Sequence, residues 1–332
     1  MPATGDKGRL AEWVYRRELA STGFTRRCWS ATRKRLARAL NDPVCSLLVH
    51  GRPLRLPLSH PLPVYLDLFP FYDRLPGRLA TLLRSVTPHI HGIDVGANIG
   101  DSLAAFGVRS GDRFLALEPS PVFHALLLEN FGNAPEVTVV RAVCGDSAPE
   151  ALRGWQFHES LGTARTQPAH DAPGVAETTI DTCIHGTPWE TQTRLLKVDT
   201  DGHDFAVLRG ARQLLKTCQP AVLFECAPHG NPAYIEEAMH AFQILCEAGY
   251  THLLLYNNFG HLLGREPLHE PARMRARLEH QLADGSYFFD LLALPPAILE
   301  EFHRSEMTAF AGIPADRFPG NFPAAPGFAG GA

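Results

Sequence analysis

The sequence predicts an α/β protein built on a mainly parallel sheet of seven strands with helices on both faces. Short apolar runs alternate with helical segments along most of the chain, which is the pattern of repeated βα units. One of these runs, at Ile93–Asp101, passes through a glycine loop directly into a helix. With 332 residues, of which 45% are hydrophobic and 20% charged, the chain is long enough to bury one large core.

The first 88 residues are interpreted as an accessory region. Residues 1–40 are expected to be helical, and Cys45–Leu58 are expected to form a hairpin about a turn at Gly51. The helical part is rich in arginine and lysine. A solvated helix face is the first interpretation of that charge, and a site for an anionic membrane or a diphosphate-linked substrate is the alternative.

Residues 89–300 are expected to form the main domain. Its seven strands are predicted at the apolar runs near Ile93, Leu115, Val139, Leu196, Leu223, Leu254 and Phe289. Helices are expected after Ser120-Pro121, after Asp204 and after Asn231-Pro232. The stretch Gly154–Glu190 interrupts the alternation and reads as a long covering loop. Residues 301–332 form a C-terminal extension whose Gly, Ala and Pro tail is expected to be mobile.

Composition excludes several classes of protein. Seven cysteines without a C-x-x-C pair argue against a disulfide framework and against structural zinc, and a reducing cytoplasm fits best. No apolar stretch is long enough for a transmembrane segment, and none resembles a signal peptide. A net charge of -4 gives no general attraction to nucleic acid. Oligomeric state cannot be inferred.

The glycine loop predicts a site for an adenosine-containing ligand. Gly96 and Gly100 let the backbone approach a ligand closely, and Glu118 follows about 20 residues later at the end of the next apolar run. A carboxylate at that place accepts hydrogen bonds from ribose hydroxyls and repels a 2′-phosphate. The loop has neither the P-loop lysine nor the G-x-G-x-x-G order, which disfavours ATP and NAD.

Four segments together resemble the FkbM family of S-adenosylmethionine-dependent methyltransferases. They are Asp94–Asp101, Leu117-Glu-Pro119, Thr179-Ile-Asp181 and, most specifically, Leu196–Asp204 with Leu208-Arg-Gly-Ala211. The resemblance covers about residues 89–265 and implies a Rossmann-like class I methyltransferase fold with S-adenosylmethionine as cofactor. The chain has Asp201-Gly-His-Asp204 where the family more usually has Glu-Gly-x-Glu, so each of these carboxylates is one methylene shorter.

The resemblance also implies a set of cofactor-binding residues. Gly96, Asn98 and Gly100 would border the methionine portion, Glu118 the ribose, and Asp146 or Ser147 the adenine edge; a plain turn is an equal interpretation of Asp146. The full set is Asp94, Gly96, Asn98, Gly100, Asp101, Glu118, Pro119, Asp146, Ser147 and Asp199.

Removal of a hydroxyl proton is the catalytic task left to the protein. The candidates are Asp199, Asp201, His203 and Glu225, with His229 in reserve. Asp199 and Asp201 repel each other unless the sulfonium, a basic side chain or a divalent metal lies nearby. A metal is compatible with this arrangement but is not expected, because a sulfonium is already a good leaving group and alignment is the main requirement.

The chain is therefore interpreted as an O-methyltransferase that acts on a hydroxyl of a glycan, a glycolipid or a polyketide-like small molecule. Two alternatives stay open. One is a non-catalytic methyltransferase-fold scaffold in a biosynthetic complex, and the other is an NAD-dependent oxidoreductase.

Overall fold

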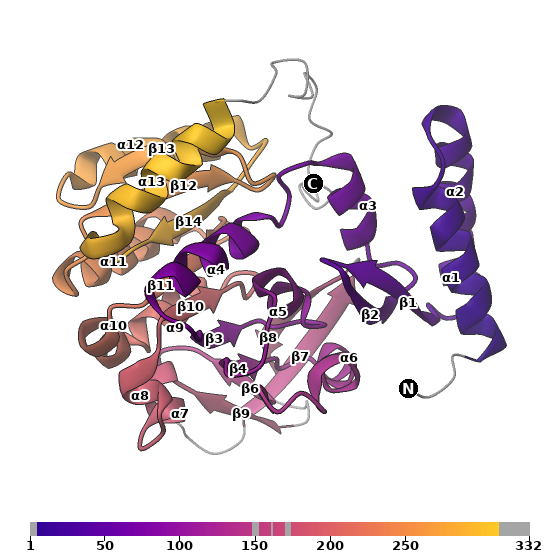
Figure 1. The fold of residues 1–332 in the computed structure, drawn as a ribbon, viewed down its shortest axis with the longest axis horizontal. Helices are drawn as coiled ribbons and strands as arrows, with labels where there is room; N and C mark the ends of the chain where they lie inside the picture. Colours follow the sequence, from indigo (N-terminus) through magenta and orange to yellow (C-terminus); the bar gives the residue numbers. More distant parts are fainter. Residues whose placement is uncertain (1–4, 148–152, 161, 170–173, 312–332) are drawn as a thin grey trace.

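The main sheet has eight strands, and it lies at the centre of the molecule (Figure 1). The structure is a computed structural model, and it describes residues 5–147, 153–160, 162–169 and 174–311. The expected mobile tail lies outside these residues. In spatial order the strands are β13 (Leu262–Pro267), β12 (His252–Asn257), β14 (Phe289–Ala293), β11 (Ala221–Cys226), β10 (Leu195–Val198), β3 (His91–Val95), β4 (Arg113–Leu117) and β5 (Val137–Val140).

Seven of these strands are those that the apolar runs predict, and the predicted α/β class is confirmed. β11, β10, β3, β4 and β5 pair in parallel, whereas β14 is antiparallel to both of its neighbours, β11 and β12. The eighth strand, β13, pairs antiparallel with β12 after a tight turn. The chain runs from β3 to β4 on one side and returns to β10 on the other, so the strand order reverses between β3 and β10. Open sheets of this kind bind ligands next to the carboxyl ends of the strands, at the point where the strand order reverses.

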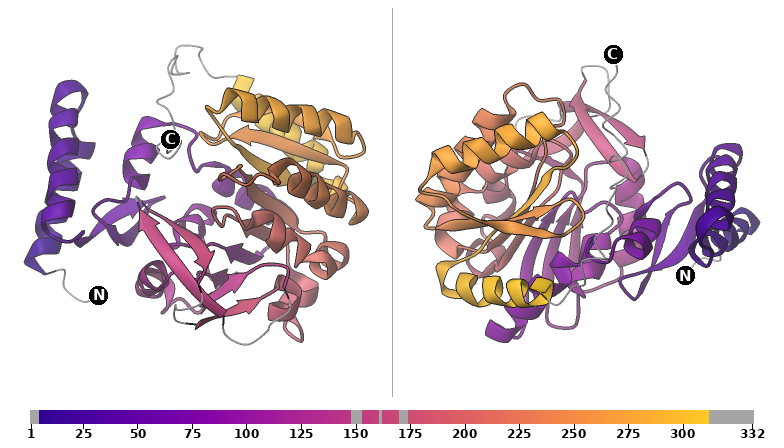
Figure 2. Two further views of the ribbon diagram at one scale, coloured as in Figure 1. Left: turned by 180° about the vertical axis from the view of Figure 1, so that it is seen from behind. Right: turned by 90° about the horizontal axis from the view of Figure 1, so that it is seen from above.

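Helices cover both faces of the sheet (Figure 2). Because side chains alternate along a strand, Phe114 and Ala116 of β4 join one buried cluster, whereas Leu115 and Leu117 join the other. The first cluster includes apolar residues of α4 (Leu75–Val86), α5 (Asp101–Phe106), α6 (Pro121–Phe131) and α13 (Pro296–Ala311). The second includes those of α7 (Ile180–Ile184), α9 (Asp204–Arg209), α10 (Arg212–Cys218), α11 (Tyr234–Glu247) and α12 (Pro271–Asp284).

The local signals for helix ends have the expected effects. Ser120 caps α6, where its side chain accepts from the amide of Phe123, and Pro121 occupies the first position. Helix α11 begins at Tyr234, slightly later than expected, and ends before Gly249, whose φ is +95°. The helix expected from Asp204 is two helices, α9 and α10. They meet at Gly210, where a Cβ atom would lie 2.0 Å from the carbonyl oxygen of Gly145.

The expected loop between Gly154 and Glu190 is instead mostly strand and helix. β7 (Arg153–Ser160) and β8 (Thr163–Pro168) form a hairpin, and with β9 (Gly174–Thr178) and β6 (Ala142–Cys144) they make a second sheet. Two short helices, α7 and α8 (Trp189–Gln192), follow. Strand β8 alternates between half-buried and exposed side chains, so few of its residues are apolar. A sequence pattern of this kind predicts a loop and not a strand.

The accessory region has the predicted helices and hairpin. α1 (Asp6–Leu19) and α2 (Gly23–Ala39) lie side by side at one edge of the molecule, and β1 (Val44–Val49) and β2 (Arg52–Pro57) connect them to the rest (Figures 1 and 2). Helix α3 (Leu62–Leu68) follows. The expected boundary at residue 300 falls inside α13. Among the described residues, no helix is both long and apolar enough to cross a bilayer.

Candidate functional site

The glycine loop between β3 and α5 is pressed against the end of β10. Gly96, Asn98 and Gly100 all have positive φ, at +76°, +48° and +87°. A Cβ atom on Gly96 would lie 1.8 Å from the carbonyl oxygen of Asp199, so only glycine fits there. The amides of Gly96 and Ala97 both donate to the carbonyl of Leu117, which holds the loop beside the end of β4.

Glu118 lies under this loop, where its carboxylate is fixed by two backbone amides. One oxygen accepts from the amide of Asn98 and the other from the amide of Ser120, each at 2.9 Å. Only 4% of Glu118 is exposed, and burial raises the pKa of its carboxyl to about 7 despite these two bonds. Each carboxylate oxygen has a second lone pair, so Glu118 can still accept from a ligand hydroxyl.

Lys197 connects the ends of β3 and β10. Its Nζ lies 3.4 Å from Asp94, 3.3 Å from Asp199 and 3.2 Å from the carbonyl oxygen of Gly96. Burial opposes its charge, but the carboxylates of Asp199, Asp94 and Asp101 together raise the pKa of Lys197 well above its ordinary value. Asp94 is fully buried and also accepts from Ser102 at 2.5 Å. Lys197 is therefore the positive group that stabilises Asp199.

A second group of acidic residues follows β10 and β11. Burial, and then the charge of Asp199, raises the pKa of both Asp201 and Asp204 to about 6. Burial and the neighbouring carboxylates raise the pKa of Glu225 well above its ordinary value. Asp290 pairs with Glu225 in register across β14 and β11, and its pKa is raised well above the ordinary value in the same way. Carboxyl groups therefore outnumber basic groups at this edge of the sheet.

His229 is the basic partner of this group. Its Nε2 lies 2.7 Å from a carboxylate oxygen of Glu225, and both side chains are mostly buried. The backbone of His229 is left-handed, with a φ of +43°, and it turns the ring back toward β11. A histidine oriented by a carboxylate in this way can accept a proton from a substrate.

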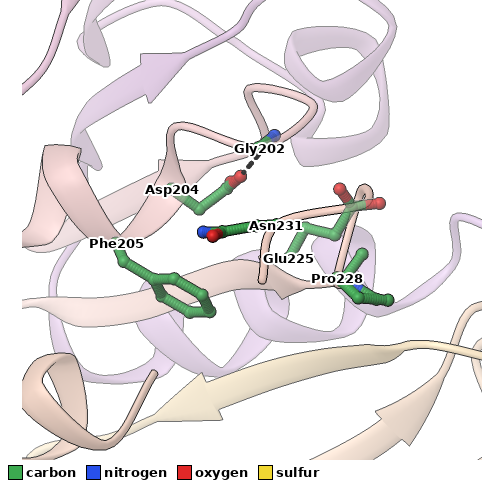
Figure 3. A pocket seen from close by; sticks show the side chains of 7 residues that line it. Gly202, Asp204, Phe205, Glu225, Pro228 and Asn231 are labelled. Carbon is green, nitrogen blue, oxygen red and sulfur yellow. Dashed lines mark hydrogen bonds between the residues drawn. The ribbon is translucent and has the colours of Figure 1, made fainter. Parts of the chain in front are cut away.

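A small polar cavity lies beside Glu225 (Figure 3). It measures about 10 Å³ and is lined by Asp204, Glu225 and Asn231 together with Phe205 and Pro228. Asp204 accepts from the amides of Thr200 and Gly202 and so fixes the loop that carries Asp201. A cavity of this size accommodates about one water molecule.

Asp201, Glu225 and His229 also form a donor set of the kind that holds a divalent metal. One ligand atom from each lies within 4.8 Å of the other two. Histidine nitrogen with carboxylate oxygens suits first-row transition metals. His229 and Glu225 are already hydrogen bonded to each other, so a metal would have to replace that bond.

We call the region beyond the carboxyl ends of β3, β4 and β10, where open sheets of this kind bind ligands, the crevice. The remaining predicted residues are divided between this region and its surroundings. Asp101 starts α5, and burial with the charge of Asp73 raises its pKa to about 7. Asp146 instead accepts from Arg209 at 2.7 Å, and Ser147 beside it is exposed. The carbonyl of Pro119 accepts from Arg141.

His203 faces the β7–β8 hairpin. Its Nε2 lies 3.2 Å from the carbonyl oxygen of Thr166, and its ring meets Trp155 edge-on. The hairpin also reaches the glycine loop, because the side-chain amide of Asn98 donates to the carbonyl of Gly162 at 2.7 Å. His203 is thus engaged in holding this hairpin over the crevice.

The sequence interpretation missed several of these groups. Asp290 lies near the start of an antiparallel strand, whereas the sequence pattern predicts ligand contacts at the carboxyl ends of parallel strands. Asp73 lies before α4, outside the strands and loops of the main sheet, and its backbone is left-handed, with a φ of +53°; no sequence pattern marks it as part of the site. Glu159 of β7 accepts a hydrogen bond from Ser120 at 2.8 Å. It lies in the segment Gly154–Glu190, for which the sequence predicts a loop.

Residues 94–251 match the model of the methyltransferase FkbM domain. This stretch, just under half of the chain, is similar to the FkbM methyltransferase family. The match includes the glycine loop, Glu118, Lys197, Glu225 and His229, whereas Asp290 lies beyond it. No curated protein matches the chain.

The solved structures to which the chain is similar are distant. Methyltransferase FkbM from Methylobacillus flagellatus is 17% identical with a TM-score of 0.34, over 58% of this chain and 54% of that one. Precorrin-6y C5,15-methyltransferase from Geobacter metallireducens is 10% identical with a TM-score of 0.32, over 65% and 86%. Phosphoethanolamine N-methyltransferase 2 from Haemonchus contortus, solved with S-adenosylmethionine, is 12% identical with a TM-score of 0.35, over 67% and 53%.

Proposed function

We propose that this protein moves the methyl group of S-adenosylmethionine to a hydroxyl of a glycan, glycolipid or polyketide-like acceptor. The catalytic unit would be residues 89–300, with residues 1–88 and 301–332 as additions to it. The observation that carries the proposal is the fixed, buried carboxylate of Glu118 beneath the glycine loop. A carboxylate held in this way is ready to accept from both hydroxyls of a ribose.

The polar groups around the loop fit this cofactor. Asn98 Oδ1 and Thr200 Oγ1 are buried, and neither has a hydrogen-bond partner among the described residues. Both lie on the loops that follow β3 and β10, where an amino group or a hydroxyl of the cofactor would satisfy them. Carboxylates with raised pKa values line the same edge, and a positive ligand there would stabilise their charged forms.

S-adenosylmethionine supplies a methyl group on a sulfonium, which is a good leaving group. The chain has to hold the acceptor oxygen in line with that methyl group and to exclude water. The β7–β8 hairpin supports exclusion of water, because it crosses from Asn98 to His203 over the crevice. The net change is one new bond from carbon to oxygen, one broken bond from carbon to sulfur, and one proton released from the hydroxyl.

We assign the released proton to the pair formed by His229 and Glu225. Their 2.7 Å contact orients the imidazole, and Asp201 lies close enough to stabilise it when it is charged. Asp199 is less suited to the role, because it is already paired with Lys197. His203 is less suited because its Nε2 faces the β7–β8 hairpin.

The test uses S-adenosylmethionine with an isotopically labelled methyl group and an extract of the source cells. Mass analysis should reveal an acceptor that gains the label from wild-type protein and does not gain it from the Glu225→Gln variant. Label found only on nitrogen or carbon atoms of the product would refute O-methylation. Folded protein that transfers no label to any fraction, even when supplied with concentrated extract, would refute the proposal as a whole.

A further inference from the structure

The α1–α2 helix pair carries a charge opposite to that of the rest of the chain. Residues 6–39 include ten Lys or Arg and three Asp or Glu, which gives a net charge of +7. The whole chain carries -4, so the other residues together carry -11. A concentration of one sign at one edge of a molecule attracts a partner of the other sign.

Most of this positive charge is not neutralised within the protein. Arg9, Arg16, Arg26 and Arg33 have carboxylate partners. The six other basic residues have no ion pair with a described residue, and they are Lys7, Arg17, Arg27, Lys34, Arg35 and Arg38. Four of these six belong to α2 and are exposed.

The four exposed basic residues of α2 lie on one face of the helix. Phe24, Arg27, Ala31, Lys34, Arg35 and Arg38 repeat at intervals of three or four residues and are all exposed, and we call them the α2 face. Phe24, at the start of this face, is 80% exposed. The charged residues therefore form a continuous stripe that begins with a large apolar ring.

Helix α1 carries exposed apolar side chains on another side of the helix pair. Leu10 is 45% exposed and Trp13 is 48% exposed. Trp13 packs edge-on against Trp29 of α2, with ring centroids 5.3 Å apart, and Arg17 lies over its ring. Trp29 lies about half a turn around α2 from the α2 face, so Phe24 is the large apolar side chain that shares a side with the charged stripe.

The pair is fixed rigidly to the protein. Arg33 forms a buried ion pair with Glu18 at 2.5 Å and donates to the carbonyl of Leu58 at 2.8 Å. Its guanidinium also lies over the ring of Tyr15, and the hydroxyl of Tyr15 donates to the carbonyl of His60. The orientation of the exposed surface is therefore set by the fold.

We infer that the α1–α2 pair binds the surface of an anionic lipid bilayer through the α2 face, which includes the exposed ring of Phe24. Basic side chains meet the lipid head groups, and the ring of Phe24 enters the boundary with the acyl chains. Nucleic acid would account for the charge, but it would leave the exposed ring of Phe24 without a role. A second copy of the chain would account for the ring, but its equal positive charge would oppose pairing of the two α2 faces.

The helix pair is joined to the β7–β8 hairpin through His60. His60, to which α1 is hydrogen bonded, lies next to Gly162 at the tip of the hairpin. The same glycine accepts the hydrogen bond from Asn98 of the glycine loop. Arg33, which anchors the pair, lies on the side of α2 away from the α2 face, so the bilayer would lie on the outer side of the pair. Binding to the bilayer does not rest on the proposed function.

The experiment is sedimentation of the full-length protein with vesicles of phosphatidylcholine, with and without phosphatidylglycerol. The protein should sediment with the phosphatidylglycerol vesicles only, and added salt should release it. The emission of a Phe24→Trp variant should shift to shorter wavelength on binding, whereas the wild-type protein has no tryptophan on the α2 face and should show a much smaller shift. Binding is read without cofactor or turnover, so its outcome is independent of the methyl-transfer proposal.

Two variants test the surface itself. The triple change Lys34→Gln, Arg35→Gln and Arg38→Gln should weaken partition into these vesicles by on the order of 100-fold. Phe24→Ala should weaken it by roughly tenfold through the lost ring. Met307→Ala, an exposed apolar residue of α13 that is 53% exposed, is the matched control and should bind as wild type does.

Four results would overturn the inference. They are equal binding to both kinds of vesicle, no binding to either by folded protein, wild-type binding by the triple variant, and a dimer in solution that the Phe24→Ala change dissociates. Binding of duplex DNA or RNA in place of vesicles would likewise assign the α2 face to nucleic acid. Thermal unfolding of each variant shows whether the helix pair is still folded.

Discussion

At the scale of single residues, the site depends on a few side chains whose partners are already in place. Glu118 is held by the amides of Asn98 and Ser120, and Asp199 is paired with Lys197. His229 has one partner in the protein, Glu225, and its other ring nitrogen has no hydrogen bond to a described residue. These differences separate the residues that we expect to bind and orient from the pair to which we assign the released proton.

The two histidines of the site give a direct test of that assignment. His229→Gln should lower kcat by roughly 100-fold or more, the usual contribution of a general base, with little change in affinity for S-adenosylhomocysteine. His203→Gln is the matched control, and it should mainly alter binding, because His203 holds the β7–β8 hairpin. Steady-state kinetics together with calorimetry would measure both. Equal losses of kcat in the two variants would contradict the assignment.

Gly96 gives a second residue-scale prediction. Gly96→Ala should destabilise the protein by roughly 3 kcal/mol, because the new Cβ meets the Asp199 carbonyl and the left-handed backbone is strained. Gly51→Ala has almost the same φ, +78° against +76°, but nothing lies within 4 Å of its added Cβ. The control should therefore lose only about 1 kcal/mol. Urea unfolding measures both, and equal losses would show that close contact at Gly96 does not matter.

At the scale of elements, the strands of the main sheet were predictable because each is a short apolar run that is buried on both faces. β3 and β10 are almost entirely buried, so their sequences carry the signal directly. β8 and β13 are partly exposed and mix polar with apolar residues, and the sequence analysis did not include them. Their positions depend on contacts made after folding, which a local pattern does not contain.

Contacts that a local sequence pattern does not contain also explain which pairings in the site could not be predicted. Asp199, Asp201 and Glu225 follow apolar runs, so their place at the edge of the sheet could be predicted. The pairing of Glu225 with His229 depends on a left-handed turn, and the pairing of Asp146 with Arg209 depends on the position of α9. Asp146 was expected at the adenine edge, and its ion pair with Arg209 favours the alternative interpretation as a structural residue.

The β7–β8 hairpin makes a prediction at this scale. Asn98→Ala removes the bond to the carbonyl of Gly162, so amide hydrogen exchange should become faster in residues 162–168. Gln243→Ala, on the exposed side of α11, removes a side-chain hydrogen bond to Glu247 and serves as the control. Exchange measured by mass spectrometry would compare the two. Unchanged exchange in the hairpin would mean that Asn98 does not hold it.

At the scale of the whole molecule, negative charge is concentrated at the carboxyl ends of the strands and positive charge on the α1–α2 pair. Burial raises the pKa values of Glu118 and Asp101 to about 7, and those of Asp201 and Asp204 to about 6. Each of these groups binds protons more tightly in the folded state than in the unfolded state. Their contribution to stability is therefore full at low pH and is lost as the pH rises through their folded pKa values.

Glu118 makes this prediction measurable. Between pH 4.5 and about 7, the Glu118→Gln variant should become steadily more stable relative to wild type, by roughly 3 kcal/mol at most, because the variant has no buried charge to form. Urea unfolding across this range would give the difference. Glu301→Gln, at an exposed position, is the control. A difference that does not change with pH would show that Glu118 does not ionise in this interval.

The central claim is that Glu118 and the glycine loop hold an adenosine-containing methyl donor, and calorimetry with S-adenosylhomocysteine tests it most directly. Wild-type protein should bind S-adenosylhomocysteine and not NADH, and Glu118→Ala should bind it about 1.5 to 3 kcal/mol more weakly through lost charge-assisted hydrogen bonds. Folded wild-type protein that binds no S-adenosylhomocysteine, or a Glu118→Ala variant that binds it as tightly as wild type, would contradict the account.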